Sequence, residues 1–121
     1  MRILILEDSR RRIRKIRKQF SMHRLTFFED ACEAIDHVRS NPFDYDAFFL
    51  DHDLGNKILC SRRNKNTGLF FVNSLLEEIR SSRTLGLIII HSWNPIGAMR
   101  MKRVLKGCGK IVRWFPYRYP F

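Results

Sequence analysis

Three short apolar runs in this chain end abruptly in polar residues, and no other feature of the sequence constrains the fold as strongly. The runs and the residues after them are Ile3–Leu6 before Glu7-Asp8-Ser9, Phe48–Leu50 before Asp51-His52-Asp53, and Ile88–Ile90 before His91-Ser92-Trp93-Asn94. Apolar runs of this length are typical of strands buried on both faces. In an open α/β sheet, the residues that follow such strands meet in a crevice at their carboxyl ends. We therefore expect a functional site there.

Helical periodicity separates the expected strands. The strands are predicted at 3–6, 25–28, 47–50, 87–90 and 110–114. The helices are predicted to follow Ser9, to span 29–39, to run as one helix from 67–68 through Ile79, and to begin at Pro95 with Asn94 as its cap. This alternation predicts an α/β fold with a five-stranded parallel sheet of order 2-1-3-4-5 and helices on both faces. The length of 121 residues indicates a single domain, 1–121.

Two segments depart from this regular pattern. The connection 52–67 is long for a strand-to-helix loop and contains four basic residues, Lys57, Arg62, Arg63 and Lys65. It is either a basic lid over the crevice or an ordinary surface loop. The segment 115–121 contains two prolines where a last helix would be expected, so that helix is missing. Its aromatic residues either cover the sheet or pair with a second copy, which leaves monomer and homodimer open.

Composition limits the partners that we expect. The net charge of +11 favours anionic molecules, such as nucleotides, nucleic acids or acidic protein surfaces. No apolar run approaches the length of a membrane span, and the first apolar run is too short for a signal peptide, so we expect a soluble, cytoplasmic protein with no membrane contact. The three cysteines, an odd number without CxxC spacing, are predicted to be reduced thiols.

The acidic pair Glu7-Asp8 and the aspartate Asp51 resemble the receiver domains of two-component response regulators, over nearly the whole chain. This resemblance implies a flavodoxin-like fold, with Mg²⁺ (or Mn²⁺) held by Glu7, Asp8 and Asp51. It also implies a phosphoryl group accepted by Asp51 and a metal contact from the Asp53 carbonyl. The receiver pattern is broken after the fourth strand, where His91-Ser92-Trp93-Asn94 replaces a lone Ser or Thr. It is broken again at Phe115, where receivers have a lysine before proline, and Lys110 or Arg113 could replace that lysine only if the strand shifts.

Two strings, LDHDLG at 50–55 and HSWNPIGA at 91–98, together resemble a receiver-like family proposed to process cyclic phosphates. The resemblance implies that the ligand is a cyclic nucleotide or a cyclic-phosphate RNA end, which the domain binds or hydrolyses as a phosphoesterase.

The residues themselves are compatible with such chemistry. Opening a cyclic phosphodiester needs a base and an acid, and imidazoles titrate near neutrality, so His52 and His91 are candidates for these roles. Asp51 or Asp53 would orient an imidazole, as the carboxylate does in a catalytic triad. The candidate phosphate-binding residues are Ser92, Asn94, Arg62 and Arg63. Alternatively, the histidines are only hydrogen-bonded structural residues and Asn94 is only a helix cap.

Seven basic residues between Arg10 and Lys18 surround the narrow apolar face of the first helix. They are either a solvated surface or a site for the RNA backbone. Three functions therefore remain after the sequence is read: a cyclic-phosphate phosphoesterase or binder, an atypical receiver used as a signalling or binding module, and a basic nucleic-acid-binding protein.

Overall fold

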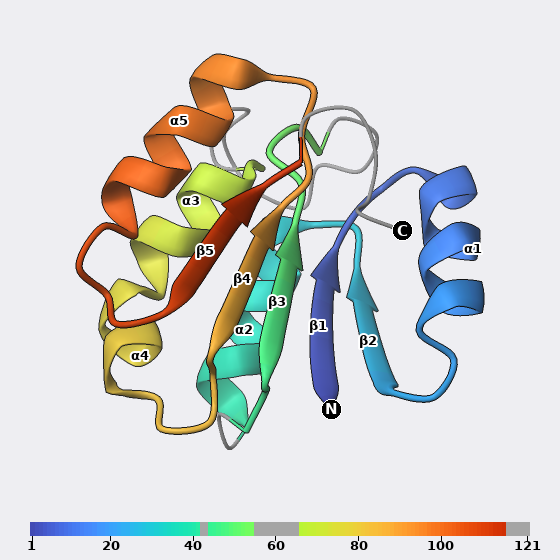
Figure 1. Cartoon of the computed structure of the whole chain (residues 1–121), viewed down its shortest axis with the longest axis horizontal. Helices are drawn as coiled ribbons and strands as arrows, with labels where there is room; N and C mark the ends of the chain where they lie inside the picture. The colour runs from blue at the N-terminus through green and yellow to red at the C-terminus, as the bar shows by residue number, and fades with distance from the viewer. Residues whose placement is uncertain (42–43, 55–65, 116–121) are drawn as a thin grey trace.

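The chain folds around a five-stranded parallel sheet of order β2-β1-β3-β4-β5, as the sequence predicts (Figure 1). The computed structural model describes residues 1–41, 44–54 and 66–115. The strands are β1 (Arg2–Leu6), β2 (Arg24–Phe28), β3 (Ala47–Leu50), β4 (Leu87–Ile90) and β5 (Ile111–Trp114). The helices are α1 (Arg10–Gln19), α2 (Ala31–Ser40), α3 (Gly68–Ser74), α4 (Leu76–Ser81) and α5 (Pro95–Val104).

Apolar side chains on the two faces of the sheet form two cores. On one face, Ile16 and Phe20 from α1 and the turn after it pack on Ile5 of β1 and Phe49 of β3. The larger core lies on the other face and joins the sheet to α2, α3 and α5. Figure 1 shows α1 standing apart from these three helices. Because β1, β3 and β4 are central and covered on both faces, their residues are almost all apolar, and the polar residues come only where these strands end.

Side-chain caps fix where four of the helices begin. In each, the side chain before the first helical residue accepts a hydrogen bond from the amide three residues further on. These caps are Ser9, Asp30, Thr67 and Asn94. The cap at Asn94 and the position of Pro95 as the first residue of α5 confirm the sequence prediction.

The prediction of a single helix from 67–68 through Ile79 is wrong. At Leu75 the backbone leaves helical geometry, with φ −108° and ψ 14°, and this residue separates α3 from α4. Leu75 is fully buried, so the apolar periodicity continues across the break. For that reason the spacing of apolar residues could not reveal it.

The prediction that all three cysteines are reduced thiols is also wrong. Cys32 is disulfide-bonded, whereas Cys108 is free and buried. An odd number of cysteines still allows one pair, and spacing along the chain does not report which thiols the fold brings together.

The described residues on either side of the segment 55–65 are held together. Asp53 and Thr67 form an antiparallel β-bridge. Buried Asn66 donates from its amide to the Leu54 carbonyl at 2.5 Å and accepts from the Ala31 amide at 3.0 Å. The basic residues of the predicted lid lie outside the described residues, and so does the tail beyond Phe115.

Phe115 continues from β5 without a helix. Its amide donates to the Ile90 carbonyl at 2.9 Å, and its ring packs against the core beneath α1. In the described ranges, no helix is long and apolar enough to cross a membrane.

Gly68 allows the start of α3 to approach the end of β3. A Cβ atom at this position would lie 2.2 Å from the Asp51 carbonyl oxygen, which is backbone and cannot move aside. We predict that Gly68→Ala lowers the free energy of unfolding by about 1–3 kcal/mol, the usual cost of overpacking. Urea denaturation measures this loss.

Gly86→Ala is the matched control, because a Cβ atom there would meet nothing within 4 Å. It should change stability by less than about 0.5 kcal/mol. Equal losses for the two variants would contradict the close approach at Gly68.

Candidate functional site

The carboxylates that follow β1 and β3 form one cluster, as the sequence predicts. Leu6 and Leu50, the last residues of these strands, are paired neighbours in the sheet. One oxygen from each of Glu7, Asp8 and Asp51 can be chosen so that all three lie within 4.8 Å of one another. The crevice at the carboxyl ends of the strands therefore contains an acidic cluster.

The Glu7 carboxylate is completely buried, and protein donors surround it. Its Oε2 atom accepts from the amides of Asp8 at 3.0 Å and Ser9 at 2.9 Å. The guanidinium of Arg12 adds a two-pronged contact, with Nε 2.6 Å from Oε1 and Nη2 3.1 Å from Oε2. Such charge-assisted bonds offset the cost of removing a carboxylate from water.

Asp51 is held mainly in its protonated form at neutral pH. Burial, followed by the neighbouring charge of Glu7, raises its pKa to about 8, although Arg12 and the His52 amide act in the opposite direction. The amide of His52 donates to Asp51 Oδ1 at 2.8 Å, and Arg12 Nη2 lies 3.3 Å from Oδ2. Burial and the neighbouring Glu7 therefore outweigh the contact with Arg12 in setting the pKa of Asp51.

The ring of His52 lies between Asp53 and the first turn of α5. Its Nδ1 atom is 2.9 Å from Asp53 Oδ1, and the side-chain Nδ2 of Asn94 lies 3.4 Å from the same oxygen. A Cβ atom at Gly97 would come within 2.5 Å of the ring, so only glycine at this position leaves room for it. When Nδ1–H donates to Asp53, the Nε2 atom keeps its lone pair and can accept a proton.

His91 differs from His52 in its surroundings. It is buried, with Nδ1 3.3 Å from Glu7 Oε1. Burial is the main cause that lowers its pKa to about 3, and Arg12 contributes further. The imidazole is therefore neutral at physiological pH and packed against the acidic cluster. Its predicted role in proton transfer stays a prediction, and its burial favours a structural role.

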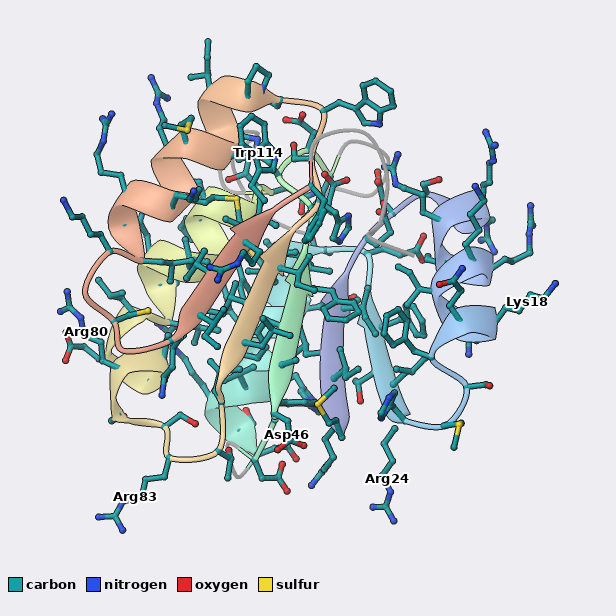
Figure 2. The ribbon with its side chains drawn as sticks, in the orientation of Figure 1. Lys18, Arg24, Asp46, Arg80, Arg83 and Trp114 are labelled. Atoms are coloured by element: carbon teal, nitrogen blue, oxygen red, sulfur yellow. The ribbon has the colours of Figure 1, made fainter. Side chains whose placement is uncertain are left out.

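The candidate phosphate-binding residues after β4 already have partners within the protein. The buried Ser92 hydroxyl accepts from the Asn94 amide at 3.0 Å, and Asn94 Oδ1 accepts from the Gly97 amide at 2.9 Å. The Trp114 indole donates to the Ser92 carbonyl at 3.2 Å, and Figure 2 shows Trp114 at this end of the sheet, beside the start of α5. These contacts shape the loop that carries Asn94.

The other two candidate phosphate-binding residues, Arg62 and Arg63, lie outside the described residues.

The acidic cluster has the oxygen ligands that a hard cation such as Mg²⁺ prefers. However, Arg12 already donates to Glu7 Oε1 and to Asp51 Oδ2. A resident metal ion does not fit the cluster in this arrangement. The mechanism proposed below therefore has no step that depends on one.

Sequence reasoning missed two residues of this site. Arg12 is one of seven basic residues in one helix. The composition of that helix does not indicate that the Arg12 side chain contacts the carboxyl groups at the strand ends. The only available signal was its place in the first turn after the acidic pair. Gly97 was noted within a motif, but its contact with the His52 ring needs the packing of α5 against the end of β3.

The sheet order and the acidic cluster define a receiver-type α/β domain. The family described as the cyclic-phosphate processing receiver domain matches residues 2–107. The chain belongs to this family. The comparison with curated proteins found no match.

Solved structures share the fold at low sequence identity. The BeF₃-activated receiver domain of Klebsiella pneumoniae RstA matches with a TM-score of 0.66 and 13% identity, over 99% of this chain and 89% of that one. A Burkholderia pseudomallei response regulator with a phosphorylated aspartic acid and a calcium ion matches with a TM-score of 0.64 and 12% identity, over 93% and 58%. A protein fused to a yeast Spc42 coiled coil matches with a TM-score of 0.66 and 15% identity, over 94% and 65%. The chain thus spans less than two thirds of the last two structures.

The raised pKa of Asp51 predicts a specific dependence of stability on pH. Between its unfolded value of 3.8 and its folded value of about 8, the unfolded chain loses the proton while the folded chain keeps it. The stability contribution of this group is therefore complete at low pH and is lost as pH rises through this window. We predict that Asp51→Asn, which keeps a neutral polar group, stabilises the fold more at pH 8 than at pH 5, as measured by thermal denaturation.

Asp36→Asn serves as the control, because it removes the same charge from an exposed position on α2. Its effect on the melting temperature should change little between the two pH values. The assignment fails if Asp51→Asn and Asp36→Asn give the same pH profile.

Proposed function

We propose that this domain binds the cyclic phosphate of a nucleotide or an RNA end in the crevice at the carboxyl ends of β1, β3 and β4, and hydrolyses it. The observation that carries the proposal is the contact of His52 with Asp53, at 2.9 Å between Nδ1 and Oδ1, beside the start of α5. An imidazole oriented by a carboxylate is a general base suited to neutral pH. The family to which the chain belongs supports the class of ligand.

In the proposed reaction, His52 Nε2 takes a proton from a water molecule as its oxygen attacks phosphorus. The P–O bond of the ring breaks, and the leaving oxygen takes a proton from Asp51. The pKa of about 8 keeps Asp51 protonated and supports its role as the acid. Catalysis of this type pairs a general base with a general acid that keeps its proton at the working pH.

The charge of the protein favours an anionic ligand. Six of the seven basic residues in α1 are exposed to solvent: Arg10, Arg11, Arg14, Lys15, Arg17 and Lys18. Lys18 points away from the sheet in Figure 2. Since α1 begins next to the acidic cluster, its field would attract a nucleotide or RNA end towards the crevice.

We predict that the protein hydrolyses at least one member of a panel of 2′,3′-cyclic, 3′,5′-cyclic and oligonucleotide cyclic phosphates, followed by chromatography. His52→Gln should lower turnover by about 100-fold or more, since general base catalysis contributes roughly that factor. Asp53→Asn should cause a smaller loss, because it disturbs only the orientation of the ring.

His23→Gln is the matched control, because His23 lies near the amino end of the sheet, where its Nδ1 contacts the chain's amino terminus at 3.0 Å. It should keep full activity. Turnover that survives in a folded His52→Gln variant would disprove the proposed base. Thermal stabilisation by one ligand without any turnover would leave a binding domain and remove the hydrolytic step.

An atypical receiver that takes a phosphoryl group on Asp51 is the second candidate, and it is favoured by the acidic cluster around that residue. A related fold from Burkholderia pseudomallei carries a phosphorylated aspartic acid. Two observations weigh against this candidate. A protonated Asp51 is a poor nucleophile. Lys110, a possible replacement for the missing receiver lysine, instead donates to the Ser82 carbonyl at 2.5 Å, near the amino end of β4.

The two candidate functions predict different results when the protein is treated with a small phosphodonor. With acetyl phosphate and Mg²⁺ (or Mn²⁺), we expect no increase in mass from phosphorylation at pH 7, because Asp51 is protonated and paired with Arg12. Intact-protein mass spectrometry checks this result. An added phosphate that is absent from Asp51→Asn would instead support the receiver function.

A further inference from the structure

The guanidinium of Arg12 occupies the centre of the acidic cluster. It joins the carboxyl group that follows β1 to the one that follows β3, with Nε 2.6 Å from Glu7 Oε1 and Nη2 3.3 Å from Asp51 Oδ2. The Arg12 side chain is 34% exposed, whereas those of Glu7 and Asp51 are 0% and 6% exposed. The Arg12 side chain is therefore more exposed to solvent than the two buried carboxyl groups that it contacts.

The other oxygens of these two groups already accept from the backbone. Glu7 Oε2 accepts from the amides of Asp8 and Ser9, and Asp51 Oδ1 accepts from the amide of His52. Within the described part of the chain, Glu7 Oε1 and Asp51 Oδ2 are the oxygens of these groups for which no backbone donor is seen. Arg12 contacts both of them, and His91 Nδ1 lies 3.3 Å from Glu7 Oε1. Since Mg²⁺ binds oxygen at about 2.0–2.1 Å, it could not share this position with a guanidinium.

We propose that Arg12 is a built-in counter-cation, and that it competes with divalent ions for Glu7 Oε1 and Asp51 Oδ2. In the resting protein Arg12 supplies an internal positive charge to the acidic cluster, and a divalent ion binds only when Arg12 turns out towards solvent. This inference concerns the cluster alone. It does not depend on the proposed hydrolysis, because it holds whether or not any cyclic phosphate is turned over.

Electrostatics gives the direction of the effect. A positive charge within a few ångströms repels a divalent cation, and partial burial of the site weakens the screening by solvent. Removing the Arg12 charge should strengthen ion binding at this cluster. Removing the charge of a neighbouring arginine that points into solvent should have a much smaller effect.

The test is calorimetric titration of the folded 121-residue protein with Mn²⁺ at fixed pH and ionic strength. Arg12→Gln should bind Mn²⁺ at least about tenfold more tightly than the wild type, because a nearby unit charge of the same sign has been removed. Arg11→Gln is the matched control, since it removes the same charge from the adjacent exposed position. Its affinity should stay within about twofold of the wild type, as expected for screened surface charges.

A second measurement uses the wild-type protein and needs no variant to fold. The Arg12 Nε–H group donates to a buried carboxylate, so its ¹⁵N-detected signal should be shifted and protected from exchange with solvent. Saturation with diamagnetic Mg²⁺ should move this signal to the position of a solvent-exposed arginine and remove the protection.

The proposal is overturned if folded Arg12→Gln binds Mn²⁺ no more tightly than Arg11→Gln, or binds none at all. It is also overturned if the Arg12 signal stays protected when Mg²⁺ is saturating. If Arg12→Gln does not fold, the wild-type signal alone decides between competition and independent binding.

Discussion

The buried carboxylate of Glu7 is the group on which the arrangement of this site depends. A charge removed from water must be compensated within the protein, and here the amides that begin the connection to α1 and the Arg12 guanidinium do so. These bonds fix how α1 leaves the end of β1. Because Arg12 also reaches Asp51, the same carboxylate connects α1 with β1 and β3, and His91 extends the contact to β4. Glu7 and Arg12 together thus contact groups at three adjacent strand ends.

Asp51 lies next to Glu7 in a site of low polarity, where burial and then the neighbouring charge of Glu7 oppose the ionisation of Asp51. Although Arg12 and the His52 amide act in the opposite direction, the pKa of Asp51 is raised to about 8. The ring of His52, the residue that follows Asp51, contacts Asp53 and lies beside the start of α5. A proton donor and a potential proton acceptor therefore come from consecutive residues, which is the chemical basis of the proposed mechanism.

The sequence predicted the fold well because the signals for the sheet are local. The limits of β3 and β4, the cap at Asn94 and the order of the strands follow from short apolar runs and helical spacing. The break at Leu75 was missed because a buried leucine keeps the apolar period while the backbone turns. The disulfide at Cys32 and the role of Arg12 were missed for a different reason, since both depend on which residues the folded chain brings together.

The sequence likewise could not distinguish the surroundings of the two histidines in the crevice. In the sequence, His52 and His91 are equivalent: each follows a short apolar strand, and these strands are neighbours in the sheet. In the structure, the His52 ring packs on Gly97 near the exposed Asp53, while His91 is enclosed beside Glu7 and the guanidinium of Arg12. Burial is the main cause of the lowered pKa of His91, and the positive charge of Arg12 beside it lowers that pKa further. The enclosed position of His91 thus distinguishes it from His52, the residue to which the proposed reaction assigns the role of base.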